Sequence, residues 1–163
     1  MPQVKNKIIL NLILVFSIFA ILAAYFIQYV LGHQPCNLCL IERVPYIFSI
    51  IIILIFLFFK KFEKIALIIL SLTFFIATLL SFYHFGIEQG FIKESLVCDL
   101  NSLDNALSKE ALLNQLKEMP KSCKDVTFKI FGLSLATLNI FISLVLSAIT
   151  TKLFLTYEKN RQK

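Results

Sequence analysis

Four cysteines are the residues of this chain whose types and spacing suggest chemistry. Cys36 and Cys39 form a C-x-x-C pair, whereas Cys98 and Cys123 lie 25 positions apart. Two thiols at the C-x-x-C spacing can close a small disulfide ring. At the start of a helix, the helix dipole also favours the thiolate form. The pattern therefore indicates thiol–disulfide chemistry at Cys36 and Cys39, together with a second, more separated cysteine pair.

Two further side chains are candidates to assist these thiols. Arg43 follows Cys39 by four residues and Cys36 by seven, so in a continuous helix all three project from one side. A guanidinium there would favour a thiolate and could hold an electronegative ligand. His84 would more often be a structural hydrogen-bonding group, but its depth makes it a candidate to line the same pocket. For Glu42, an interfacial ion pair is as good an interpretation as a functional role beside the thiols.

Metal binding and purely structural disulfides are the alternatives to redox chemistry. Four thiolates can hold zinc, but such a site usually has two close pairs, and this chain has one C-x-x-C. A Cys98–Cys123 disulfide could also simply close its loop, which would stabilise the fold by about 3 kcal/mol. The C-x-x-C beside a separated pair favours redox use over a four-thiolate metal-binding protein or a structural membrane protein with stapling disulfides.

The elements that must position these residues are predicted to be transmembrane helices. Of 163 residues, 58% are hydrophobic and only 16% are charged, against about 25% charged in soluble domains. Lipid offers no partner to free backbone groups, so apolar segments cross it as helices. We predict an all-α membrane protein with one integral membrane domain, residues 1–163. It is a four-transmembrane-helix bundle with helices at about 8–31, 38–59, 65–86 and 130–151.

The second crossing determines where the C-x-x-C pair lies. Its charge-free part, Val44–Phe59, has 16 residues and spans only about 24 Å as a helix, so it must include residues from about 38 onward. This places Cys36 and Cys39 at the membrane boundary. Pro45 should kink or loosen the first turns of that helix.

Basic residues predict the orientation of the bundle. The N-terminus, the 60–64 turn and the C-terminus carry nine basic and two acidic residues, whereas segments 32–43 and 87–129 carry seven basic and eight acidic ones. The positive-inside rule therefore places both termini in the cytoplasm and all four cysteines on the outer side, which fits an oxidising compartment. The net charge of +6 is thus an orientation signal, and no nucleic-acid partner is expected.

The motif around the C-x-x-C resembles that of a known family. The stretch Gln34–Arg43, Q-P-C-N-L-C-L-I-E-R, closely resembles the Q-P-C-x-L-C-x-x-E-R signature of the DsbB family of disulfide bond formation proteins. Tyr83–Gly90, Ser122-Cys123 and Phe131–Ser134 are also similar to this family. The resemblance covers the whole chain. It implies a multi-pass protein of the bacterial inner membrane with periplasmic loops at 32–37 and 87–129, the longer one between helices 3 and 4.

The resemblance implies a quinone-dependent thiol oxidase. Such a protein reoxidises a periplasmic thioredoxin-like oxidase of the DsbA type and passes two electrons to membrane quinone, either ubiquinone or menaquinone. By position, Cys98–Cys123 would be the bridge that the partner's thiolate attacks. Cys36–Cys39 would reoxidise that bridge and be reoxidised by quinone.

Two other positions match the family, and one segment departs from it. Arg43 matches the arginine that assists quinone binding, and His84 falls near a quinone-proximal position. The 87–129 loop, however, is rich in Lys and Glu and has little aromatic content near Cys98. We therefore expect its partner-facing surface to differ from that of better-known members.

Overall fold

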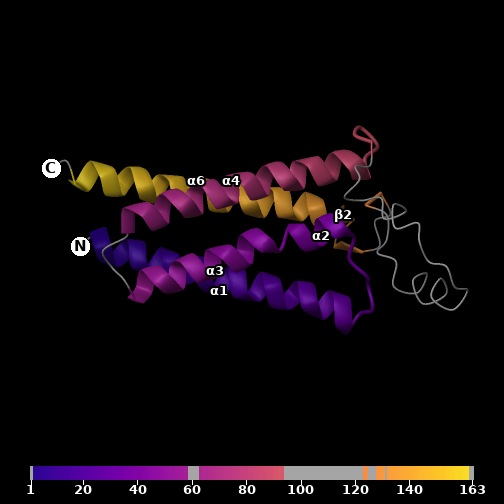
Figure 1. The fold of residues 1–163 in the computed structure, drawn as a ribbon, viewed down its shortest axis with the longest axis horizontal. Coiled ribbons are helices and arrows are strands. Elements are labelled where there is room, and N and C mark those ends of the chain that lie inside the picture. Colours follow the sequence, from indigo (N-terminus) through magenta and orange to yellow (C-terminus); the bar gives the residue numbers. More distant parts are fainter. Residues whose placement is uncertain (1, 59–62, 94–122, 125–127, 131, 162–163) are drawn as a thin grey trace, which may run out of the picture.

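A computed structural model of the protein describes residues 2–58, 63–93, 123–124, 128–130 and 132–161. In chain order its elements are α1 (Pro2–Tyr29), α2 (Asn37–Ile41), α3 (Val44–Phe58), α4 (Glu63–Glu88), β1 (Lys129–Ile130), β2 (Leu133–Ser134) and α6 (Leu135–Arg161). The long helices run along one axis, with the N- and C-terminal ends of the chain at the same end of the bundle (Figure 1). The short helix α2 and strand β2 lie at the opposite end.

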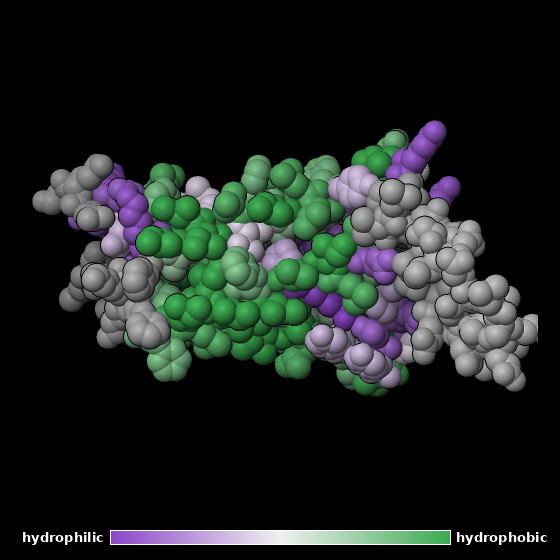
Figure 2. Space-filling view, viewed as in Figure 1, coloured by the Kyte–Doolittle hydropathy of each residue, from purple (hydrophilic) through white to green (hydrophobic). Residues whose placement is uncertain are grey.

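Four stretches are long and apolar enough to cross a membrane. They are Lys7–Tyr29, Asn37–Phe58, Glu63–Glu88 and Leu135–Asn160, with mean hydropathies between 1.9 and 2.6. Figure 2 shows a broad hydrophobic band over the middle of one face and hydrophilic residues toward both ends. The predicted mostly helical architecture with four membrane-spanning segments is confirmed, whereas most of the predicted loop at 87–129 lies outside the described residues.

The helices pack in the order α1, α3, α4 and α6. Ile53, Leu67, Leu70 and Phe74 are fully buried between them. Small hydroxyl residues let the backbones approach and add hydrogen bonds between helices, as is common in membrane bundles. One such pair is Ser71 and Thr151, whose Oγ and Oγ1 atoms lie 2.6 Å apart between α4 and α6.

The second crossing is broken into α2 and α3 rather than being one continuous helix. Pro45 has no N–H to donate to the preceding turn. Just before it, the N–H of Arg43 bonds to Leu40 O at 3.2 Å, in a tighter turn than that of an α-helix. The break at residues 42–43 lies where Pro45 was predicted to loosen the helix. The expected continuous alignment from Cys36 to Arg43 is therefore wrong.

The fourth helix begins later than the predicted residue 130. Lys129 pairs with Ser134 and Ile130 with Leu133 in a small antiparallel hairpin, and α6 starts only at Leu135. Gly132 has a φ of 82°, which glycine adopts without steric cost. An apolar run alone does not distinguish this short hairpin from a first helical turn.

The ends of the first and last helices also differ from the predicted boundaries. Helix α1 begins at Pro2 and ends at Tyr29, instead of spanning 8–31, and α6 continues to Arg161, well beyond residue 151. Hydropathy locates only the apolar part of a helix. Lys, Glu, Gln and Arg are good helix formers, so the helices continue past their apolar segments.

Two adjacent phenylalanines on α4 provide a test of this packing. Phe74 is 0% exposed and Phe75 is 53% exposed. We expect Phe74→Ala to lower the free energy of unfolding by about 3–5 kcal/mol, because it leaves a cavity between helices. The matched control Phe75→Ala removes the same atoms from a lipid-facing position and should change it by less than about 1 kcal/mol. Unfolding in detergent measures both, and equal losses would contradict the described helix orientation.

Candidate functional site

The C-x-x-C thiols lie at the beginning of α2. Cys36 is the N-cap residue, and its Sγ accepts a hydrogen bond from the backbone N–H of Cys39 at 3.3 Å. The two Sγ atoms are 2.6 Å apart, and both cysteines are free thiols. The N-cap position and the C-x-x-C spacing thus bring the two sulfurs into direct contact.

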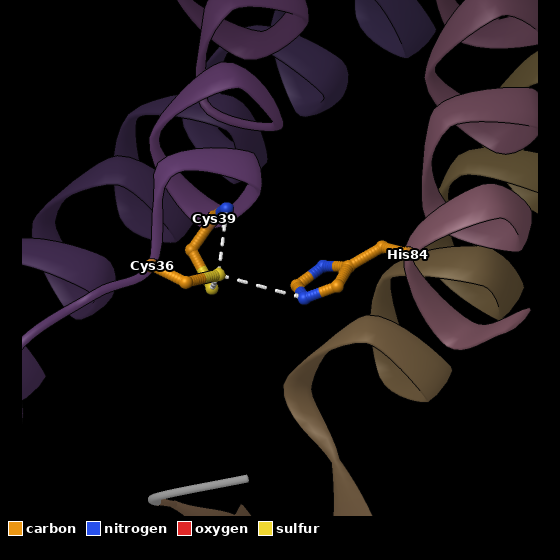
Figure 3. Close-up of side chains that lie close together, drawn as sticks. All are labelled: Cys36, Cys39 and His84. Atoms are coloured by element: carbon orange, nitrogen blue, oxygen red, sulfur yellow. Dashed lines mark hydrogen bonds between the residues drawn. The ribbon is translucent and has the colours of Figure 1, made fainter. Parts of the chain in front are cut away.

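His84 of α4 reaches across the bundle to Cys36, as Figure 3 shows. Its Nε2 lies 3.5 Å from Cys36 Sγ and its Nδ1 lies 2.8 Å from Glu42 Oε1. A second carboxylate oxygen, Glu88 Oε1, is 3.8 Å from Nε2. The histidine is therefore both a buried hydrogen-bonding group and a direct neighbour of the thiol.

Arg43 lies at the break between α2 and α3 and is held by residues of α1. Its Nη1 donates to Gln28 Oε1 at 2.7 Å, and its Cζ is 5.1 Å from the centroid of the Tyr25 ring. The guanidinium is thus fixed by a charge-assisted hydrogen bond and a cation–π contact. The sequence favoured Arg43 as the group beside the thiols, but the side chain that the structure places against Cys36 Sγ is His84.

These groups line a cavity of about 370 Å³. Its polar part contains both thiols together with Glu42, Arg43, His84 and Asn139. Its apolar walls come from α1, including Phe16 and Phe19, and from α6, including Leu138 and Ile142. Phe16 and Phe19 are also partly exposed on the outside of α1, so this wall of the cavity reaches the apolar surface of the bundle. A mostly apolar pocket with a few convergent polar groups is typical of a small-molecule site.

Cys123 lies against the same thiols. It is 2% exposed and packs in one buried cluster with Cys36, Leu38 and Ile87, with Cys39 at the edge of that cluster. Cys123 is in a disulfide. Cys98 lies outside the described residues, so its pairing with Cys123 stays a prediction. Three of the four cysteines therefore meet at one end of the bundle.

Asn139 of α6 is a site residue that the sequence did not reveal. Its Nδ2 donates to Glu42 Oε2 at 2.9 Å and to Ser81 Oγ at 2.8 Å, and its Oδ1 accepts from the Tyr46 hydroxyl. The signal that could have found it is an amide in an otherwise apolar span, where a polar side chain needs a partner within the bundle.

The donor set also bears on the metal-binding alternative. Cys36 Sγ, Cys39 Sγ and one ring nitrogen of His84 all lie within 4.8 Å of one another. A four-thiolate site, however, needs Cys123 as a ligand, and Cys123 is in a disulfide. The described residues therefore do not favour the four-thiolate alternative over thiol chemistry.

Comparison with known proteins decides the family. The family model described as disulfide bond formation protein DsbB matches residues 6–153. The chain belongs to the DsbB family. It is also similar to uncharacterized protein RP370 of Rickettsia prowazekii (strain Madrid E), with 32% identity over 157 residues, covering 94% of this chain and 91% of that protein. No solved structure matches the chain. Membership of the DsbB family and the four apolar helices make it a multi-pass membrane protein of disulfide bond formation.

The position of Cys36 in this DsbB-family protein favours its thiolate. The hydrogen bond from the Cys39 thiol is the largest influence and lowers the pKa of the Cys36 thiol, while the hydrogen bond and charge of His84 lower it further. Burial raises the pKa but does not cancel these contributions. Cys36 is therefore expected to ionise at a lower pH than a free cysteine.

We predict that reduced Cys36 reacts with iodoacetamide at pH values well below the roughly 8.5 at which a free cysteine ionises. Its thiolate should persist above the lowered pKa and disappear as the pH falls through it. Cys39→Ala removes the main stabilising hydrogen bond and should move the midpoint of the rate profile upward. Mass spectrometry of the Cys36 peptide measures the rate, and the protein unfolded in detergent is the control. A folded midpoint equal to the unfolded one would contradict the assigned environment.

Proposed function

We propose that this protein is a protein-disulfide oxidoreductase of the bacterial inner membrane that uses membrane quinone as its electron acceptor. It reoxidises a periplasmic thioredoxin-like oxidase of the DsbA type and so supports disulfide bond formation. The observation that carries the proposal is the position of the Cys36 and Cys39 thiols. They pack with disulfide-bonded Cys123 and line a cavity whose walls are mostly apolar side chains of α1 and α6.

The cysteine arrangement supports a two-stage relay. In the first stage, a thiolate of the reduced partner attacks the proposed Cys98–Cys123 bridge and forms a mixed disulfide. In the second stage, the reduced outer pair exchanges with a Cys36–Cys39 disulfide. Cys36 is suited to this exchange because it shares a buried cluster with Cys123 and has a stabilised thiolate.

The cavity suits a flat ring with polar oxygens and an apolar tail. Quinone supplies the two-electron chemistry, accepting two electrons and two protons when it is bound. Arg43 offers a fixed cation to an electronegative ligand, because Gln28 and Tyr25 hold its guanidinium. Phe16 and Phe19 line the apolar wall on α1, along which a lipid-soluble tail can lie. His84 is proposed to line the ring-binding end beside Cys36.

We further propose that both termini are cytoplasmic and that the thiols face the periplasm. The excess of basic residues around the termini supports this orientation. Figure 1 is consistent with it, because both chain ends lie at one end of the bundle and α2, which carries Cys39, lies at the other. The four cysteines then share the oxidising side.

The relay is tested with the purified protein, a ubiquinone or menaquinone analogue, and a reduced DsbA-type protein. We expect stoichiometric oxidation of the partner and reduction of the quinone. Cys36→Ser should abolish both, because the inner disulfide can no longer form. Cys98→Ser should stop partner oxidation while the Cys36–Cys39 disulfide stays reducible by small dithiols. Partner oxidation at the wild-type rate in either variant would exclude the relay and favour a structural role for the cysteines.

Quinone recognition is tested separately at Arg43 and at the residue that holds it. Arg43→Ala should raise the KM for quinone about tenfold or more, because the charge-assisted hydrogen bond to the ligand is lost. Gln28→Ala should raise it by less, because only the charge-assisted hydrogen bond that holds the guanidinium is lost. The KM for the partner protein should not change. Gln89→Ala is the matched control, because Gln89 is exposed in the turn that follows α4. An unchanged KM and rate with quinone in Arg43→Ala would contradict its proposed role.

A further inference from the structure

The imidazole of His84 joins a carboxylate to a thiol inside the bundle. His84 is 2% exposed, with Nδ1 2.8 Å from Glu42 Oε1 and Nε2 3.5 Å from Cys36 Sγ. Because each ring nitrogen has a partner, the tautomer decides whether His84 donates to the thiol or accepts from it. That tautomer depends on what holds Glu42.

Asn139 fixes the carboxylate of Glu42 as a hydrogen-bond acceptor. The Asn139 Nδ2 donates to Glu42 Oε2 at 2.9 Å and to Ser81 Oγ at 2.8 Å. Its orientation is set by the Tyr46 hydroxyl, which donates to Asn139 Oδ1. The Ser81 hydroxyl donates onward to Ala77 O at 2.9 Å, so Ser81 can only accept from the amide. The donors and acceptors of this chain of bonds are therefore mutually consistent.

An accepting carboxylate requires that the neutral imidazole carry its hydrogen on Nδ1. The lone pair then lies on Nε2, which faces Cys36 Sγ. An unprotonated ring nitrogen beside a thiol is positioned to act as a base, and a carboxylate behind the ring stabilises the imidazolium that forms. Glu88 Oε1, 3.8 Å from Nε2, places a second carboxylate near that nitrogen.

We propose that Asn139 is a positioning residue that acts through Glu42 and His84 to hold Cys36 as the thiolate of the reduced pair. The S–H bond of Cys36 breaks, its proton moves to His84 Nε2, and the electron pair stays on Sγ. In the exchange with the reduced outer pair, the Cys36–Cys39 bond breaks and the outer S–S bond forms. The two electrons pass to the inner sulfurs, Cys39 takes the remaining thiol proton, and Cys36 is left as the thiolate beside His84. The exchange is balanced in protons and electrons, and its use in turnover rests on the proposed thiol-oxidase function.

Other titratable groups line the same cavity and contribute to its pH response. They are Cys39 on α2, Arg43 at the break, Tyr46 on α3, Glu88 on α4 and His33 in the segment before α2. The Cys39 thiol hydrogen-bonds directly with Cys36 Sγ, so every variant in the test retains Cys39. Arg43 is held by Gln28 on α1. Changes confined to Asn139, Glu42 and His84 therefore isolate the proposed chain of bonds.

The test measures the pH profile of Cys36 alkylation by iodoacetamide in the fully reduced, full-length protein without quinone. Asn139→Leu should raise the midpoint by about one pH unit, which is about a tenfold loss of thiolate at lower pH. Glu42→Gln keeps the size of the side chain but removes the charge behind the ring, so it should shift the midpoint in the same direction. His84→Ala should shift it most, and added imidazole should restore part of the rate.

Ser143→Ala is the matched control on α6. The Ser143 hydroxyl is buried but bonds to carbonyl oxygens of its own helix, those of Asn139 and Ile140. Its loss should leave the Cys36 midpoint unchanged. Thermal unfolding of each variant shows whether it is folded, and Glu42→Gln carries the test if Asn139→Leu does not fold.

Two results would overturn the proposal. One is a wild-type midpoint in folded Asn139→Leu and Glu42→Gln. The other is a loss of thermal stability with no change in the midpoint, which would make Asn139 a structural residue only. Because alkylation requires neither quinone nor a partner protein, the proposed oxidase function is judged separately by the turnover assay. Shifted midpoints in a protein that reduces no quinone would reject that function alone.

Discussion

Hydrogen bonds to one buried carboxylate connect three membrane crossings at the end of the bundle that carries the thiols. Glu42 follows α2, and its two oxygens bond to His84 on α4 and to Asn139 on α6. Because lipid offers no alternative partner, these bonds fix the relative placement of the three segments where they meet. The position of the C-x-x-C pair, the direction in which the imidazole faces and the shape of the cavity all depend on this one group.

The break at residues 42–43 has a functional consequence. In a continuous helix Arg43 would extend the face of Cys36 and Cys39. In the structure the turn directs its guanidinium toward Gln28 and Tyr25 on α1, while His84 lies against Cys36. The site therefore has two cationic or basic groups with separate surroundings. Arg43 is held against α1, and His84 is positioned at the sulfur.

The thiols lie inside the protein, yet they adjoin both a disulfide and a cavity. Cys36 lies in a buried cluster with disulfide-bonded Cys123, while the cavity beside it has apolar walls from α1 and α6. A dithiol at the start of the second apolar crossing thus lies between a protein disulfide and a mostly apolar cavity. This geometry agrees with membership of the DsbB family of disulfide bond formation proteins.

The sequence by itself determined the four apolar crossings, the placement of the C-x-x-C at the start of the second one and the effect of Pro45. These depend on composition, segment length and the local chemistry of proline, all of which are encoded within a few consecutive residues. The hairpin before α6, the neighbour of Cys36 and the role of Asn139 were decided only in the tertiary structure. His84 is 48 positions from Cys36, and Asn139 is 97 from Glu42. Such contacts depend on how the helices rotate and pack against one another, which local patterns do not specify.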